Sequence, residues 1–100
     1  MLIGVPSEIK PQEHRVGLVP SSVKEFVGHG HKVIVQAGSG LGINFSDEAY
    51  KNVGAEIVSS AEEVFARADM IIKVKEPQPS EYKLIRENQI VFTYLHLAAD

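Results

Sequence analysis

Short apolar runs alternate along the chain with segments in which apolar residues recur at helical spacing. The clearest run, MIIKV at 70–74, lacks the apolar/polar alternation of a half-exposed strand. Such a run is typical of a parallel strand that is covered on both faces. Pro77 has no N–H for a sheet ladder and favours an extended residue before it, so we expect this strand to end at about Lys75 or Glu76.

The remaining apolar runs predict further strands. They are expected at 2–5, 32–37, 55–58 and 89–95, and residues 16–19 are expected to form either a strand or an extended loop. These runs are short, rich in Val and Ile, and bounded by Pro, Gly or polar residues, as strands usually are.

Serine caps predict helices between the strands. The segments SVKE at 22–25 and SAEE at 60–63 have the capping-box spacing, which indicates a helix start at each serine. Two further helices are expected, one at 47–53 after Ser46 and one that begins at Ser80 and ends near residue 88. Because strands and helices alternate, we predict an α/β fold with a doubly wound, mainly parallel sheet and helices on both faces.

Composition narrows the class of protein. The 100 residues are 44% hydrophobic and 23% charged, as in an ordinary globular protein, and suffice for one domain or part of one. The net charge of −3 argues against a nucleic-acid partner. The chain has no cysteine for disulfides or thiolate metal sites, and no apolar run approaches the ~18 residues of a membrane span. We therefore expect a cytoplasmic protein that does not enter a membrane.

A glycine-rich loop, GSGLGI at 38–43, follows the strand expected at 32–37 and resembles the start of a nucleotide-binding motif. The dinucleotide fingerprint requires a glycine at the sixth place, where this chain has Ile43. The next helix also begins several residues too late, after Ser46. We therefore interpret the loop as a glycine-dependent turn and expect no cofactor-binding residue in this chain.

Three side chains are candidates for chemistry. Lys75 follows the strand at 70–74, His96 follows the last strand, and Arg15 follows the loop after the first strand. Ligands of open α/β sheets bind beyond the carboxyl ends of the strands, where these groups can converge. An arginine fork, a lysine charge and a histidine that titrates near neutral pH together suit a small carboxylate substrate.

Each candidate also has a purely structural interpretation. Lys75 can be a solvated lysine beside the glutamate that follows it, and His96 can be a capped or solvent-facing histidine. Arg15 can form an ion pair with Glu8 or Glu13. The three remaining histidines lack the spacing of metal ligands, so we expect no metal site.

Five segments of the chain share their order and spacing with a known family. They are GVPSEIK at 4–10, EHRVGLVP at 13–20, QAGSG at 36–40, IKVKEP at 72–77 and TYLHLAA at 93–99. With these segments the chain strongly resembles the amino terminus of the alanine dehydrogenase and nicotinamide nucleotide transhydrogenase family. The segments that contain Lys75 and His96 resemble the alanine dehydrogenase branch.

The resemblance implies an enzyme that reversibly deaminates L-alanine to pyruvate and ammonium with NAD. Arg15 matches the residue that holds the substrate carboxylate, and Lys75 matches a second substrate-binding cation. His96 matches the catalytic acid/base, which must move protons during deamination. The resemblance also implies a homo-oligomer, a hexamer, in the intact enzyme.

The resemblance further implies a domain arrangement. Residues 1–100 correspond to the N-terminal part of the substrate-binding domain, and another crossover helix is expected to start at His96. The NAD-binding domain and a second acid/base carboxylate are expected beyond residue 100, so the 100 residues alone are expected to be inactive. Two alternatives stay open, namely the N-terminal part of a proton-translocating NAD(P) transhydrogenase α-subunit and a non-catalytic α/β binding module.

Overall fold

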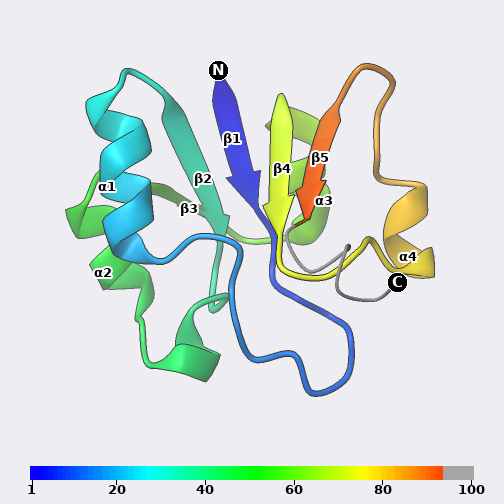
Figure 1. Ribbon diagram of the computed structural model, residues 1–100, viewed down its shortest axis with the longest axis horizontal. Coiled ribbons are helices and arrows are strands. Elements are labelled where there is room, and N and C mark those ends of the chain that lie inside the picture. Colours follow the sequence, from blue (N-terminus) through cyan, green and yellow to red (C-terminus); the bar gives the residue numbers. More distant parts are fainter. Residues whose placement is uncertain (94–100) are drawn as a thin grey trace.

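Five parallel strands form one sheet in the order β3-β2-β1-β4-β5 in the computed structural model, which describes residues 1–93 (Figure 1). The strands are β1 (Leu2–Val5), β2 (Lys32–Gln36), β3 (Glu56–Val58), β4 (Met70–Lys73) and β5 (Ile90–Thr93). Each strand pairs in parallel with its neighbours. The predicted parallel sheet is therefore confirmed, whereas His96 lies outside the described residues.

Four α-helices and a short 3-10 helix connect the strands. They are α1 (Pro20–Gly28), η1 (Leu41–Ile43), α2 (Asp47–Asn52), α3 (Ala61–Arg67) and α4 (Pro79–Tyr82). Figure 1 shows α3 behind the sheet, while α1 and α2 lie on its β2–β3 side. Helices thus cover both faces of the sheet, as the alternating pattern predicted.

The strands β1 and β2 point successive side chains into two hydrophobic cores, one on each face. The first core packs buried residues of these strands against α1 and α2 and includes Ile3, Val5, Val33, Val35, Val23 and Tyr50. The second packs against α3 and includes Ile34, Ile71, Val64, Phe65 and Ala68. Burial on both faces explains why the strand sequences are continuous apolar runs rather than alternating ones.

Helix α3 lies unusually close to β1 because Gly4 has no side chain. A Cβ atom at Gly4 would overlap the Cβ of Ala68 and the Cγ1 of Val64. Both of these contact residues are fully buried. The glycine is therefore required by the packing of the helix on the central strand.

The helix starts agree with the sequence for α3 but not for α1. Ser60 caps α3, since its Oγ accepts the N–H of Glu63 at 3.2 Å, and Val64 and Phe65 point inward as expected. The capping box expected at Ser22 is wrong, because α1 already begins at Pro20. Proline suits the first helical position, where its missing N–H costs no hydrogen bond and its fixed φ is already helical.

The structure decides the form of residues 16–19 and the end of β4. Residues 16–19 form an extended loop, the second of the two expected alternatives. Strand β4 ends at Lys73 and not at Lys75 or Glu76. The reason is that the next two backbone N–H groups donate to the side chain of Glu8 instead of continuing the ladder.

The helix expected from residue 80 to about 88 is only one turn long. Helix α4 begins at Pro79 and ends at Tyr82. Beyond it, the side chains of Arg86 and Gln89 donate to the carbonyl oxygens of Phe65 and Ala68 at the end of α3. These long-range hydrogen bonds hold the chain in a turn that leads directly into β5.

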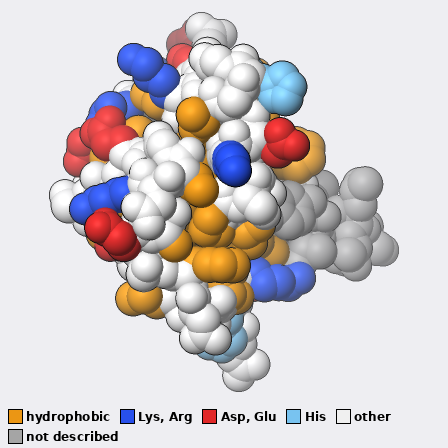
Figure 2. Space-filling view, turned by 90° about the vertical axis from the view of Figure 1, so that its left-hand side faces the viewer, with side chains coloured by type: hydrophobic (Ala, Val, Ile, Leu, Met, Phe, Trp, Pro, Cys, Tyr) orange, Lys and Arg blue, Asp and Glu red, His pale blue; other side chains and the backbone are white. Residues whose placement is uncertain are grey.

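The surface on the α1–α2 side is mixed in character. Figure 2, which views the molecule from this side, shows hydrophobic side chains between scattered acidic and basic ones. Among the described residues in this view, the basic side chains do not form the stripe that nucleic-acid binding requires. None of the helices within residues 1–93 is long and apolar enough to cross a membrane.

Candidate functional site

The candidate site lies at the carboxyl ends of β1 and β4. Residues 6–19, here called the β1–α1 loop, leave the end of β1 and run past these strand ends before α1 begins (Figure 1). Ser7 N donates to Gln36 Oε1 at the end of β2 at 2.9 Å. The hydroxyl of Tyr50 donates to the carbonyl oxygen of Leu18 at 2.8 Å. Both ends of the loop are therefore fixed to the sheet and its helices.

The middle of the β1–α1 loop is held by an unexpected buried ion cluster. Lys73 Nζ lies 3.3 Å from Glu8 Oε1 and 3.4 Å from Glu81 Oε2, and the three side chains are only 1–3% exposed. Buried charges are tolerated only when they are paired with opposite charges. Lys73 Nζ donates a hydrogen bond to Glu8 Oε1, whereas Glu81 Oε2 is ion-paired with Lys73 but accepts no hydrogen bond from the described residues. Lys73 is not among the site residues predicted from the sequence. The sequence signal for a buried ion cluster is a lysine inside an otherwise apolar strand.

Arg15 forms a two-pronged ion pair within its own loop. Its Nε and Nη2 donate to Glu13 Oε2 and Oε1, each at 2.9 Å. The guanidinium hydrogen bonds hold the pKa of Glu13 below its ordinary value, and the charges of Arg15 and Lys75 act in the same direction. The Glu13 side chain is 4% exposed, whereas that of Arg15 is 57% exposed. The pairing with Glu13 considered from the sequence is therefore present.

The backbone of Lys75 is held by the side chain of Glu8. Its backbone N–H donates to Glu8 Oε1 at 3.2 Å, and its side chain is half-buried. Within residues 1–93, no hydrogen bond or ion pair engages the Lys75 ammonium. Its positive charge contributes to the lowered pKa values of Glu13 and Glu76. Arg15 thus contacts Glu13 directly, and the positive charge of Lys75 favours the ionised form of the same carboxylate.

The third predicted residue, His96, lies outside the described residues. The roles assigned to Arg15, Lys75 and His96 stay predictions. Within residues 1–93, no group of three His, Cys, Asp or Glu side chains could hold a metal ion.

The glycine-rich loop forms the turn that was expected, and it faces the β1–α1 loop. Gly38 has a φ of +80°, and its N–H donates to Asp47 Oδ1 at 2.8 Å. A Cβ atom at Gly42 would overlap the carbonyl oxygen of His14. The N–H of Gly38 is thus already bound within the protein, and the backbone of His14 fills the space beside Gly42. This turn therefore does not suit a dinucleotide phosphate.

A polar cavity of about 180 Å³ opens between this turn and the β1–α1 loop. Its lining includes Arg15, Glu13 and Ser39. Ser39 is buried, and its hydroxyl has no hydrogen-bond partner among the described residues. The volume is of the size of a few water molecules or a small organic acid.

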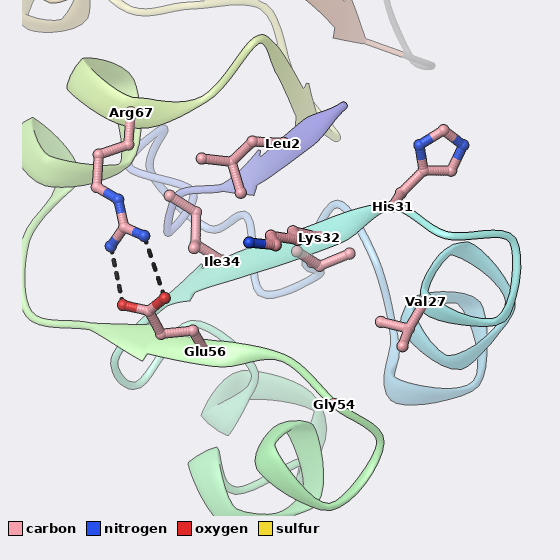
Figure 3. A pocket seen from close by; sticks show the side chains of 9 residues that line it. Leu2, Val27, His31, Lys32, Ile34, Gly54, Glu56 and Arg67 are labelled. Atoms are coloured by element: carbon pink, nitrogen blue, oxygen red, sulfur yellow. Dashed lines mark hydrogen bonds and ion pairs between the residues drawn. The ribbon is translucent and has the colours of Figure 1, made fainter.

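A second cavity, of about 450 Å³, lies at the opposite end of the sheet (Figure 3). Leu2, Lys32 and Glu56, which line it, are the first residues of β1, β2 and β3. Arg67 donates to both carboxylate oxygens of Glu56, at 2.8 and 3.1 Å, and lowers the pKa of this glutamate. Because ligands of open α/β sheets bind at the carboxyl ends, this cavity is the weaker candidate despite its size.

Comparison with known proteins identifies the family of the chain. The sequence profile described as "Alanine dehydrogenase/PNT, N-terminal domain" matches residues 4–100. The alanine dehydrogenases of Methanococcus maripaludis and Bacillus subtilis are 57% and 50% identical over 100 residues, which is all of this chain and 27% and 26% of theirs.

Two solved structures have the same fold. One is an L-alanine dehydrogenase with a TM-score of 0.92 and 52% identity, covering 99% of this chain and 27% of that one. The other is a transhydrogenase from Sinorhizobium meliloti with a TM-score of 0.86 and 32% identity, covering 93% of this chain and 27% of that one. The chain thus spans about a quarter of the length of the relatives that it matches. With residues 4–100 matched by the family profile, the chain belongs to the alanine dehydrogenase/PNT N-terminal domain family.

Proposed function

We propose that the chain is the N-terminal part of the substrate-binding domain of an NAD-dependent L-alanine dehydrogenase. The reaction converts L-alanine, water and NAD⁺ reversibly into pyruvate, ammonium, NADH and a proton. The observation that carries this proposal is the two-pronged hydrogen bonding of the Arg15 guanidinium to the Glu13 carboxylate, in the loop at the carboxyl ends of β1 and β4. A guanidinium fork that holds a carboxylate, with the charge of Lys75 acting on the same group, suits an amino acid and its oxo acid.

The proposed roles follow from the chemistry of each side chain. Arg15 binds the substrate carboxylate through its planar fork, which is now occupied by Glu13. Lys75, whose ammonium is not engaged within residues 1–93, binds the carboxylate and the carbonyl oxygen of pyruvate as a point charge. His96 moves protons during addition of water to the iminium and loss of ammonia, because an imidazole titrates near neutral pH.

NAD accepts the hydride, and we place its binding site beyond residue 100. This assignment is supported by the glycine-rich turn, which does not suit a dinucleotide phosphate. In the intact protein we further propose a cytoplasmic location and a homo-hexamer. A molar-mass measurement on the purified intact protein tests the hexamer, which a monomer or dimer would contradict.

The alanine dehydrogenase assignment is favoured over a transhydrogenase by similarity. The alanine dehydrogenase relatives are 46–57% identical to this chain, whereas the solved transhydrogenase is 32% identical. The test is to assay the intact protein for NADH formation that depends on L-alanine, and for NADH oxidation that depends on pyruvate and ammonium.

We expect both activities, and we expect Lys75→Ala to reduce kcat/KM for pyruvate by about tenfold to 100-fold, since the charge-assisted hydrogen bonding of one cation contributes roughly 1.5–3 kcal/mol. A protein that instead exchanges hydride between NAD(H) and NADP(H) without alanine would be a transhydrogenase. A protein with neither activity would overturn the proposal.

A further inference from the structure

We propose that Glu8 is a positioning residue that holds Lys75 in the substrate site and couples it to the loop that carries Arg15. This inference rests on the proposed function. It adds to that function a residue that does not touch the substrate. The side chain of Glu8 is buried, with only 2% of its surface exposed.

Three hydrogen-bond donors converge on the carboxylate of Glu8. The N–H of Val74 donates to Oε2 at 2.9 Å. The N–H of Lys75 and the ammonium of Lys73 both approach Oε1, at 3.2 and 3.3 Å. The two backbone donors are the first N–H groups after the end of β4. Glu8 therefore takes the place of a strand neighbour and fixes the backbone of Lys75 at the point where the sheet no longer does.

Only a carboxylate can accept all of these hydrogen bonds. Both oxygens of Glu8 are used, and every group that faces them is a donor. An amide in the same place would turn an NH₂ group toward a backbone N–H or toward the Lys73 ammonium. In a buried cluster, such an unpaired donor is costly. The charge of Glu8, and not only its shape, is thus required.

Glu8 also joins two separate parts of the proposed site. It belongs to the β1–α1 loop, seven residues before Arg15, and its partners in the sequence segment 73–75 lie 65 to 67 residues away. The neighbouring Lys10 forms a weaker, more exposed ion pair at 3.3 Å with Glu76, the residue that follows this segment. A displacement of Glu8 would therefore move Lys75 relative to Arg15. That distance decides whether one small carboxylate can contact both.

Glu81 provides a matched control, because it contacts the same Lys73 ammonium from α4. Glu81 Oε2 lies 3.4 Å from Lys73 Nζ, and its side chain is 3% exposed. Its other oxygen accepts the N–H of Gln78, and neither oxygen contacts the Val74 or Lys75 backbone. Glu81→Gln thus weakens the buried ion cluster as Glu8→Gln does but leaves the contacts to Lys75 intact.

The experiment compares Glu8→Gln, Glu8→Asp and Glu81→Gln in the intact protein. Hydrogen–deuterium exchange of the segment that contains Val74 and Lys75 is measured first, since it requires no activity. Steady-state KM and kcat for pyruvate and for NADH are measured next. Glu8→Asp keeps the negative charge beside Lys73 but shortens the side chain by one methylene, so it serves if Glu8→Gln does not fold.

We expect both Glu8 variants to accelerate exchange at residues 74–75 and to raise KM for pyruvate by about tenfold, the effect of one lost charge-assisted hydrogen bond. KM for NADH should not change, and kcat should fall less than the pyruvate KM rises. Glu81→Gln should leave exchange at residues 74–75 and the pyruvate KM within about twofold of wild type.

Two results would overturn the inference. One is unchanged exchange at residues 74–75 in the Glu8 variants. The other is a change in pyruvate KM that is as large in Glu81→Gln as in Glu8→Gln, which would indicate a merely structural cluster. If the wild-type protein does not turn over alanine, the proposed function fails, whereas the exchange measurement still decides whether Glu8 holds Lys75.

Discussion

Lys73 is the residue whose environment differs most from what its type would suggest. Its side chain is 1% exposed and carries a charge among buried apolar side chains, with two glutamates as partners. Lysine is almost never fully buried without such partners. The cluster is therefore a point at which a single substitution has a large effect on stability.

Lys73→Met is expected to lower the free energy of unfolding by about 3–5 kcal/mol. Methionine fills a similar volume, but Glu8 and Glu81 are then left buried without a positive charge. The control is Lys10→Met, which breaks the ion pair with Glu76 between two side chains that are about 40% exposed. That change should cost less than about 1 kcal/mol. Denaturant unfolding of both variants measures the difference, and similar losses would refute the assignment of a critical buried charge.

Glu13 supplies a pH-dependent prediction at the same scale. Hydrogen bonds from Arg15 lower its pKa from the ordinary 4.5, so the ion pair stabilises the folded state above that pH. This contribution is lost as the pH falls through the lowered pKa of Glu13. Because Arg15 is largely exposed, we expect it to be less than about 1 kcal/mol.

Replacement of Arg15 by Gln tests this assignment. The pKa of Glu13 should rise in the variant, and the difference in stability between variant and wild type should disappear at low pH. An NMR titration of the Glu13 carboxyl carbon gives the pKa directly. A Glu13 pKa that is equal in both proteins would contradict the pairing.

At the scale of elements, local sequence signals located the strands better than the ends of the helices. The apolar runs at 2–5 and 32–37 correspond closely to β1 and β2. Strands that are buried on both faces are continuous apolar runs, and such runs are easily located in a sequence. Helix α1 begins before its predicted cap, and α4 is one turn long. In both places, proline at the first helical position decided where the helix begins.

A pair of serine substitutions distinguishes the true helix cap from the false one. Ser60→Ala should lower the free energy of unfolding by about 1 kcal/mol, because Ser60 Oγ accepts the N–H of Glu63. Ser22→Ala should change it by less than about 0.5 kcal/mol, because Ser22 lies inside α1 and does not cap it. Thermal or denaturant unfolding of the two variants measures both values, and equal losses would mean that α1 starts at Ser22 after all.

At the scale of the whole molecule, the two predicted substrate-binding cations set an expected affinity for pyruvate. Arg15 and Lys75 supply roughly 1.5–3 kcal/mol each, while a millimolar dissociation constant already requires about 4 kcal/mol. We therefore expect the 100-residue chain to bind pyruvate with a Kd of about 1 mM or weaker and to show no NAD reduction with alanine.

An NMR titration with pyruvate tests this expectation, with the same chain carrying Lys75→Ala as control. Saturable shifts near Arg15 that disappear in the variant would mean that the substrate half of the site is assembled without the remainder of the protein. Binding that is equally strong in the variant would contradict the role of Lys75.

The sequence by itself determined the fold class and most strands. Apolar runs, β-branched residues and caps such as Ser60 act over a few neighbouring residues, so they can be identified without knowledge of the rest of the chain. Arg15 and Lys75 were predicted to converge because parallel strands present their carboxyl ends at one edge. Arg15 hydrogen-bonds Glu13, and the charge of Lys75 helps to lower the pKa of the same glutamate, while the roles of both cations in a substrate site stay predictions.

Only the tertiary structure decided the strand order, the early end of β4 and the partners of Lys73. The order puts β1 at the centre of the sheet, between β2 and β4. Glu8 contacts Lys73 across 65 residues of sequence, and no local pattern encodes a contact at that separation. A buried charge requires a counter-charge from whichever segment packs against it. That segment is known only when the whole chain has folded.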